Sequence, residues 1–348
     1  MRFYTQQHQY YCGIDLHTQN MYVCIVNQAG KIMYHYNLPV SKDSLLCVIE
    51  PYLPDVAIAV ECIFTWYWIA DFCSQHKVPF VLGHALYMKA IHGGKTKNDK
   101  IDSHKIAMLL RGGMIPMSYV YPAQMRSTRD LLRRRMYFVH KRSELLSHIQ
   151  NTKFQYNLPD FQKRIDRKSN RIGINEHFED AGVRKSIELD MALLDTYELL
   201  LKEVEQYLSE HAKENNLTDL SLLRTIPGVG KILALVILYE IHDINRFASV
   251  QNFVSYARLI KPKKESAGKT TGAANRKMGN AYLRWAFGEA AILMLRERPE
   301  VKKYHQKLKS KHGKAKALAI LTHRIGRSVY YMLTKQKVFD IDKFIHAN

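Results

Sequence analysis

The chain has 348 residues, of which 47% are hydrophobic, and it carries a formal net charge of +20. This length and apolar fraction predict two or three folded domains and argue against disorder of the whole chain. The N-terminus lacks the apolar core of a signal peptide, and no run of about 18 apolar residues occurs. We therefore expect a cytoplasmic protein that has no membrane partner.

The positive charge is concentrated near the C-terminus. Residues 251–348 hold 22 Lys or Arg against 6 Asp or Glu, a net +16, whereas residues 1–120 have a net charge of only +2. A positive field of this strength favours a polyanion as partner, because each neutralised phosphate releases condensed counterions. The charge distribution therefore predicts a protein that acts on nucleic acid.

The first 120 residues predict a mixed domain of strands and helices. Runs rich in aromatic and β-branched residues predict strands at 10–16, 21–27, 32–38, 56–62 and 78–82. Helical patterns occupy residues 41–53, which Ser41 can cap, and residues 66–76 and 98–110. Three antiparallel strands followed by alternating helix and strand are the order of an RNase H-like α/β domain.

Helical patterns dominate the rest of the chain. Two long helices, at 124–156 and 181–215, flank an irregular basic connector and predict a coiled-coil arm or a helical hairpin. A helical linker packed on its own domains would give the same pattern. The fold class expected is α/β plus α. We predict a RuvC-like (RNase H fold) domain at 1–120, a helical arm at 121–216 and a mainly helical domain at 217–348.

Four acids in the first domain form the strongest catalytic pattern. Asp15 lies in the first strand and Glu61 near the end of the fourth, while Asp99 and Asp102 are three residues apart and share one helix face. Strand ends and one helix face can bring these carboxylates into a single cleft, where hard oxygen ligands bind Mg²⁺ or Mn²⁺. Taken singly, an acid in a strand or at a helix start is usually a turn or cap residue.

Two further segments bear on nucleic-acid binding. The sequence TIPGVGK at 225–231 predicts a Gly-rich turn between two helices that resembles a helix-hairpin-helix, and Lys231 starts the second helix next to turn amides that can hold a phosphate. Short turns of this kind also occur without any ligand.

The composition of residues 261–279 predicts a flexible basic loop, and composition does not distinguish Ser266, Thr270 and Thr271 as candidate nucleophiles. The candidate nucleic-acid contacts are Arg133, Arg134, Lys231, Lys263, Lys264, Lys269, Arg276 and Lys277.

The motifs together resemble a known family. The segments YYCGIDLH, KNDKIDSHKIA, LLRTIPGVGK, RFASVQNFVSYARL and ESAGKTTGAANRKMGNAYLRWAF, with the Glu61 strand end and the tail KALAILTHRIGRSVYYML, run in order from residue 11 to residue 333. This set resembles the insertion-sequence one-ten family of DEDD transposases, which includes the Piv DNA invertases. The resemblance places the DEDD set on Asp15, Glu61, Asp99 and Asp102.

The resemblance also implies a chemistry and a set of partners. It implies that Ser266 is the nucleophile, although here Ala267 intervenes before the Gly that often follows the serine directly. It implies a serine–phosphodiester intermediate on donor and target DNA, with Mg²⁺ or Mn²⁺ at the DEDD site. It further implies a non-coding bridge RNA, which delegates sequence choice to base pairing. Because Ser266 and the four acids lie in separate predicted domains, we expect a dimer or tetramer in which the composite site can form between subunits.

Three alternatives stay open at this point. A Piv-like site-specific invertase shares every residue named above. A RuvC-like structure-specific nuclease uses the acids without a covalent serine intermediate. A non-enzymatic nucleic-acid-binding protein derived from a transposase tolerates loss of the acids, and the presence of all four argues against it.

Overall fold

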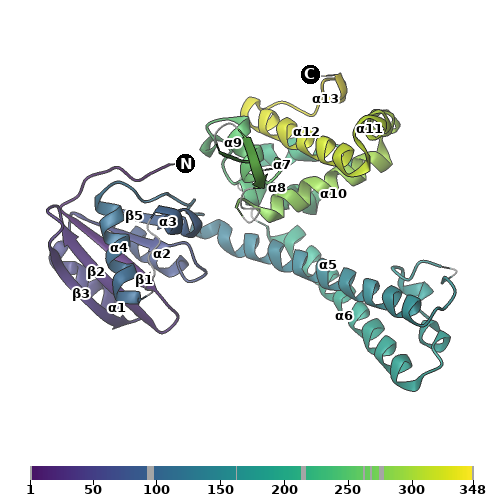
Figure 1. The fold of residues 1–348 in the computed structure, drawn as a ribbon, viewed down its shortest axis with the longest axis horizontal. Coiled ribbons are helices and arrows are strands. Elements are labelled where there is room, and N and C mark those ends of the chain that lie inside the picture. Colours follow the sequence, from purple (N-terminus) through teal and green to yellow (C-terminus); the bar gives the residue numbers. More distant parts are fainter. Residues whose placement is uncertain are drawn as a thin grey trace. The chain divides into compact units, whose positions relative to one another are not determined.

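The computed structural model describes residues 2–91, 98–161, 163–212, 217–261, 263–266, 269–273 and 278–346, and for residues 90, 263–266 and 270–273 it describes the backbone alone. The chain divides into two compact units, Met1–Gln124 and Met125–Asn348. The first unit holds the mixed sheet, and the second is mainly helical (Figure 1). Within the described residues, no helix combines the length and the apolar character that crossing a bilayer requires.

The first unit is built on a five-stranded sheet. Its strands are β1 (Tyr10–Leu16), β2 (Asn20–Asn27), β3 (Ile32–Pro39), β4 (Val56–Glu61) and β5 (Phe80–Gly83). The order across the sheet is β3-β2-β1-β4-β5, in which β1, β2 and β3 are antiparallel neighbours while β4 runs parallel to both β1 and β5. The strand pattern predicted from the sequence is confirmed.

Helices cover both faces of this sheet. They are α1 (Lys42–Ile49), α2 (Tyr67–Gln75), α3 (Ala85–Ile91) and α4 (Asp99–Arg111). Side chains alternate along β1, so that Cys12, Ile14 and Leu16 pack in one core with α1 and α2, whereas Tyr11 packs in the other core with α4. Ser41 caps α1 as predicted, but α1 ends at Ile49 rather than near residue 53. Pro51 explains the early end, since it has no N–H to donate to an α-helix. The sequence analysis did not predict α3.

One glycine sets the distance between α4 and the sheet. A Cβ atom on Gly13 would lie 2.3 Å from the backbone nitrogen of Ala107 and 2.4 Å from the carbonyl oxygen of Ser103. The backbone of α4 therefore lies directly against β1, two residues before Asp15. Any larger side chain at position 13 would force the helix away from the strand.

The second unit begins with a helical hairpin. Helices α5 (Ala123–Gln155) and α6 (Ala181–His211) run antiparallel and are joined by ion pairs such as Arg135–Glu205 at 2.6 Å and Arg142–Glu198 at 2.8 Å. Near the end of the hairpin, Ile149 of α5 packs against Ile187 and Leu194 of α6. An apolar stripe and lateral charge pairs thus hold the two long helices together.

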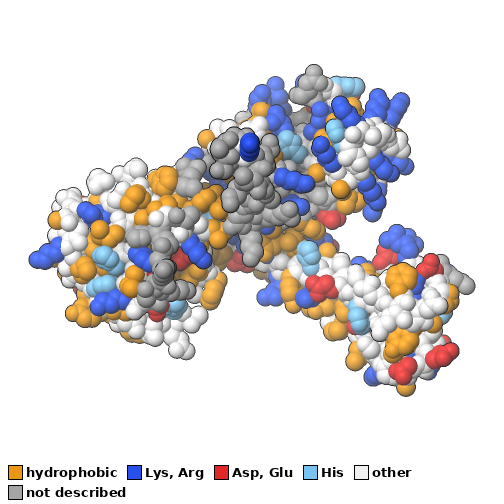
Figure 2. All heavy atoms as spheres, viewed as in Figure 1, with side chains coloured by type: hydrophobic (Ala, Val, Ile, Leu, Met, Phe, Trp, Pro, Cys, Tyr) orange, Lys and Arg blue, Asp and Glu red, His pale blue; other side chains and the backbone are white. Residues whose placement is uncertain are grey.

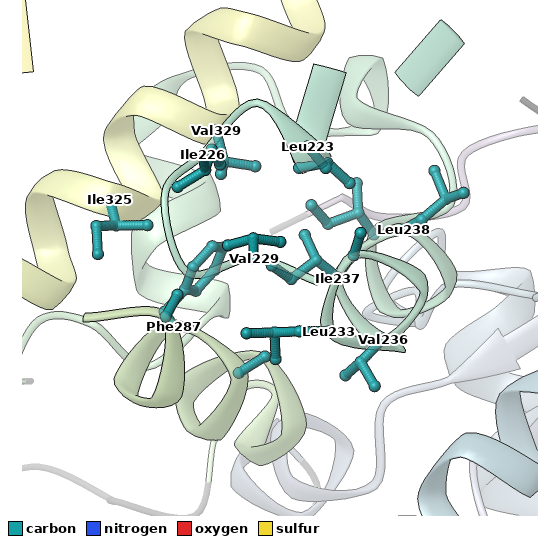
Figure 3. Close-up of a cluster of buried hydrophobic side chains, with 14 of the residues drawn as sticks. Leu223, Ile226, Val229, Leu233, Val236, Ile237, Leu238, Phe287, Ile325 and Val329 are labelled. Atoms are coloured by element: carbon teal, nitrogen blue, oxygen red, sulfur yellow. The ribbon is translucent and has the colours of Figure 1, made fainter. Parts of the chain in front are cut away.

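The remaining elements form a helical core around α8. They are α7 (Leu217–Arg224), α8 (Lys231–Ile241), α9 (Val250–Tyr256), β6 (Lys263–Ser266), β7 (Lys269–Ala273), α10 (Ala281–Glu297), α11 (Pro299–His312), α12 (Lys314–Lys335) and α13 (Ile341–His346). Every residue from Leu233 to Ile241 is buried, and all of them except Glu240 are aliphatic or aromatic, so that α8 packs on all sides. Figure 3 shows Leu233 and Ile237 of α8 close to Phe287 of α10, with Ile325 and Val329 on α12.

Candidate functional site

Two of the four predicted acids lie at one edge of the sheet. Asp15 is the penultimate residue of β1, and Glu61 is the last residue of β4. The two strands are parallel, and Ile14 is paired in register with Val60. Asp15 and Glu61 are therefore the next residues along neighbouring strands, at the carboxyl edge of the sheet.

Helix α4 supplies the other two acids from its first turn. Asn98 caps the helix by accepting a hydrogen bond from the Lys100 amide at 2.9 Å. Asp99 and Asp102 follow within the first turn, where the positive end of the helix dipole stabilises carboxylates. On the β3 side, the imidazole Nε2 of His35 lies 2.8 Å from the carbonyl oxygen of Lys100 and ties this turn to the sheet.

A histidine joins the acids where β1 and α4 meet. The Nε2 atom of His17 lies 3.5 Å from Oδ2 of Asp15 and 3.4 Å from Oδ2 of Asp99. Each of the three residues offers one ligand atom, and these atoms all lie within 4.8 Å of one another. Glu61 and Asp102 are not members of this group; Asp102 lies 3.3 Å from the ammonium nitrogen of Lys105. That four acids gather around one or two ions stays a prediction.

Sequence reasoning missed His17. The signal was present in the motif YYCGIDLH, where His17 stands two positions after Asp15. Residues two apart at a strand end face the same side of a sheet, so the histidine belongs beside the aspartate.

The electrostatics of Asp15 fit a site that takes a cation. Burial raises the pKa of Asp15, His17 lowers it, and the nearby carboxylates of Asp99 and Asp102 raise it again. A positive charge placed between such a carboxylate and its neighbours would stabilise its ionised form. The two carboxylates are oxygen donors that suit Mg²⁺ or Mn²⁺, and the imidazole is a nitrogen donor that suits transition metals, so the residues present fit a divalent ion.

The predicted nucleophile lies in a hairpin rather than in a flexible loop. β6 and β7 pair antiparallel, with Ser266 opposite Lys269 in the register. The sequence analysis expected a flexible basic loop over residues 261–279, whereas residues 263–266 and 269–273 form paired strands, because backbone hydrogen bonds between the strands do not depend on side-chain composition. Of Ser266, Lys263 and Lys264 the structure describes the backbone alone, while Ala267, Gly268, Arg276 and Lys277 lie outside the described residues. Lys269 is exposed.

The chain that leaves this hairpin is anchored to the helical core. Gly279 has φ +91°, and a Cβ atom there would lie 2.5 Å from the carbonyl oxygen of Tyr256. The Asn280 amide donates to that same oxygen at 2.6 Å, and the Arg258 guanidinium donates to the carbonyl of Met278 at 2.9 Å. Asn280 also caps α10. The end of α9 thus holds the segment that follows the hairpin.

Several predicted nucleic-acid contacts have partners within the protein. Arg133 donates to Glu240 at 2.6 and 3.0 Å, and its guanidinium lies 4.2 Å from the ring centre of Tyr282. Lys231 donates to the carbonyl of Ser209 at 2.9 Å. In the Gly-rich turn, the Gly228 amide donates to Glu297 at 2.8 Å. These contacts give Arg133 and Lys231 structural roles, and their binding to nucleic acid stays a prediction. Arg134 is exposed.

A basic surface lies where α11 meets α12. Within ten consecutive residues, five exposed lysines occur and no acid: Lys307, Lys309, Lys311, Lys314 and Lys316. Among the described residues, none of the five forms an ion pair with a carboxylate. Figure 2 shows Lys and Arg side chains gathered over these helices. We call this set the α11–α12 lysines.

Comparisons with known proteins find transposases along most of the chain. Residues 12–156 match a DEDD transposase model of the IS110 type, described as a transposase, and residues 220–306 match the model described as the Transposase IS116/IS110/IS902 family. The chain is also 21% identical over 336 residues to the transposase for insertion sequence element IS1111A of Coxiella burnetii (strain RSA 493 / Nine Mile phase I). That alignment covers 94% of this chain and 90% of the relative.

Proposed function

Because the chain belongs to the IS110 family of DEDD transposases and is a DNA transposase of an insertion sequence, we propose that it cuts and rejoins DNA through a covalent serine–phosphate link. The observation that supports this proposal is the placement of its chemical groups. Asp15, His17 and Asp99 cluster at the end of β1, as a metal-assisted reaction requires. Ser266 lies in a basic hairpin that follows α9.

The proposed reaction exchanges one phosphodiester for another. The Oγ atom of Ser266 forms a bond to a DNA phosphorus as the bond from that phosphorus to one deoxyribose oxygen breaks. The serine gives up its proton and the released deoxyribose oxygen gains one, so the step needs no oxidant and no energy source. A deoxyribose hydroxyl of the other DNA end then attacks the same phosphorus, and the bond from phosphorus to Oγ of Ser266 breaks. The serine regains a proton, and the DNA is resealed.

The DEDD residues serve this reaction by holding a divalent cation. Asp15 and Asp99 would bind it through their carboxylates, with Glu61 at the same sheet edge and Asp102 one turn along α4. A bound Mg²⁺ or Mn²⁺ would stabilise charge on the phosphate oxygens and make a hydroxyl easier to deprotonate. Gly13 contributes by letting α4 carry Asp99 close to β1.

The proposal also includes partners. We propose donor and target DNA as substrates, a structured bridge RNA that pairs with them, and a homo-oligomer as the active species. The strongly basic residues 251–348 suit phosphate backbones of either nucleic acid. Sequencing RNA that copurifies with the full chain tests the RNA partner directly, and recovery of only random cellular fragments would contradict it.

Ser266→Ala is expected to abolish the covalent protein–DNA adduct, lowering its yield by at least about a thousandfold, as loss of a serine nucleophile does elsewhere. Thr270→Ala and Thr271→Ala, which change hydroxyls on the facing strand β7, are the matched controls and should keep the adduct. Denaturing electrophoresis of labelled DNA followed by peptide mapping measures the outcome. An adduct that persists in Ser266→Ala, or maps to another residue, would falsify the assignment.

Replacing Lys307, Lys311 and Lys314 together with glutamine is expected to weaken DNA binding for all sequences alike. Each phosphate contact contributes about 0.9 to the slope of log K against log salt concentration, so three lost contacts lower that slope by about 2 to 3. Fluorescence anisotropy of a labelled duplex at several salt concentrations measures it.

The control removes the same charge from the arm. The triple change of Lys168, Lys185 and Lys202 to glutamine alters residues of the α5–α6 hairpin, two of which already pair with Asp195 or Glu188. This control should leave the slope nearly unchanged. Equal effects of the two triple variants would mean that net charge, rather than contact at the α11–α12 lysines, governs binding.

A further inference from the structure

We infer that His17 is a metal ligand of the DEDD site and that its imidazole makes the site prefer Mn²⁺ over Mg²⁺. This inference rests on the proposed metal-assisted function and adds to it a nitrogen donor that a purely carboxylate site lacks. The ligand set would then be Asp15, His17 and Asp99, with Glu61 and Asp102 at the margin.

The backbone fixes His17 at the place where a ligand is needed. Its amide donates to the carbonyl of Asn20 at 3.0 Å, which closes the tight turn between β1 and β2. Because His17 follows Asp15 by two residues, its ring extends from the same side of the sheet edge. Asp99 approaches from the first turn of α4, which Gly13 allows to lie against β1. Three separate backbone constraints therefore converge on this spot.

The distances fit a shared ion better than direct bonding. The Nε2 atom of His17 lies 3.5 Å from Asp15 and 3.4 Å from Asp99, both longer than the roughly 2.7–3.2 Å of an ordinary N–H···O hydrogen bond. Neighbouring ligands on an octahedral ion with bonds of about 2.1 Å lie about 3 Å apart. Small side-chain movements would thus bring all three atoms onto one cation.

The exposure of the His17 ring would leave a bound ion accessible to substrate. The side chain of His17 is 50% exposed and that of Asp99 is 54% exposed, whereas Asp15 is only 15% exposed. Asp15 therefore forms the floor of the site, and the other two groups stand at its rim. An ion held there would still face solvent, where the phosphate of a nucleic acid can reach it.

The identity of the donor predicts the metal. Mg²⁺ takes oxygen ligands almost exclusively, while imidazole nitrogen suits transition metals. Among first-row divalent ions Mn²⁺ is the weakest binder of nitrogen, yet it still gains from an imidazole more than Mg²⁺ does. Loss of His17 should therefore reduce Mn²⁺ affinity much more than Mg²⁺ affinity.

The test measures metal binding on the full chain without DNA. Mn²⁺ is titrated by electron paramagnetic resonance of the free ion, and Mg²⁺ affinity is obtained by competition. His17→Ala is expected to weaken Mn²⁺ binding by on the order of tenfold or more and Mg²⁺ binding by less than about threefold. His76→Ala, which removes an exposed histidine at the end of α2, is the control and should change neither.

A direct readout separates the failure of this inference from the failure of the proposed function. In the wild type, pulsed resonance of bound Mn²⁺ should show coupling to a ¹⁴N nucleus, and that coupling should vanish in His17→Ala. Mn²⁺ that binds, depends on Asp15, and shows no nitrogen coupling would overturn the role of His17 alone. If Asp15→Asn weakens the binding of neither Mn²⁺ nor Mg²⁺, or if neither ion binds, the metal site itself is overturned.

Discussion

Glu240→Ala is expected to destabilise the second unit by about 3 to 5 kcal/mol, because it leaves the buried Arg129 and the half-buried Arg133 without their shared carboxylate. Glu240 lies on α8 and is 2% exposed. It accepts hydrogen bonds from Arg129 at 3.1 Å and from Arg133 at 2.6 Å. Asn280 donates to it at 2.8 Å. One carboxylate thus links α5, α8 and the cap of α10.

The charge state of Glu240 sets the pH range over which it stabilises the fold. Burial alone would raise the pKa of Glu240, but the hydrogen bond from Arg133 and the charges of Arg129 and Arg133 hold it below its ordinary value. A depressed carboxylate pKa stabilises the fold above the pKa of the unfolded chain, and this contribution is lost as pH falls through the folded-state pKa. The network is therefore intact at neutral pH and fails in acid.

Urea denaturation followed by far-ultraviolet circular dichroism measures the loss. Glu205→Ala is the matched control, since Glu205 pairs with Arg135 at 2.6 Å but is 38% exposed, and pairs of that kind contribute about 0 to 1 kcal/mol. Similar effects of the two variants would show that burial does not set the value of the Glu240 network. Glu240→Gln, which keeps the shape and loses the charge, should fall between them.

Gly13→Ala is expected to destabilise the first unit by about 3 kcal/mol or more and to weaken metal binding at the same time. The new Cβ would lie 2.3 Å from the Ala107 nitrogen and 2.4 Å from the Ser103 oxygen, which are backbone atoms of α4 that cannot rotate away. Forced overpacking of a tight core costs about 1 to 3 kcal/mol, and contact with backbone is at the upper end. The helix must shift, and Asp99 shifts with it.

Thermal unfolding and Mn²⁺ titration of the same samples measure both effects. Gly288→Ala in α10 is the control, because no atom outside its chain neighbours and the nearby backbone of its own helix lies within 4 Å of the Cβ position there. The identical substitution should stabilise the protein by up to about 1 kcal/mol through helix propensity. A Gly13→Ala protein with wild-type melting temperature and metal affinity would refute the proposed dependence of the site on this contact.

Local pattern in the sequence was enough to predict the sheet and the position of the acids within it. A run rich in aromatic and β-branched residues predicted β1, and the apolar run before Glu61 predicted β4. Their parallel pairing came from the structure. The motif resemblance was enough to identify a transposase, and the comparisons confirmed it. These features depend on residues close together in the chain, which is why they can be read without the fold.

Contacts between distant residues were decided only by the tertiary structure. The sequence shows Arg133 and Lys231 as basic residues free for phosphate, but folding brings Arg133 to Glu240 and Lys231 to Ser209. The proximity of His17 to Asp99 likewise depends on how closely α4 packs against β1 at Gly13. Charge and motif are properties of a segment. Whether a basic side chain binds a group within the protein or faces solvent depends on burial, which exists only once the chain has folded.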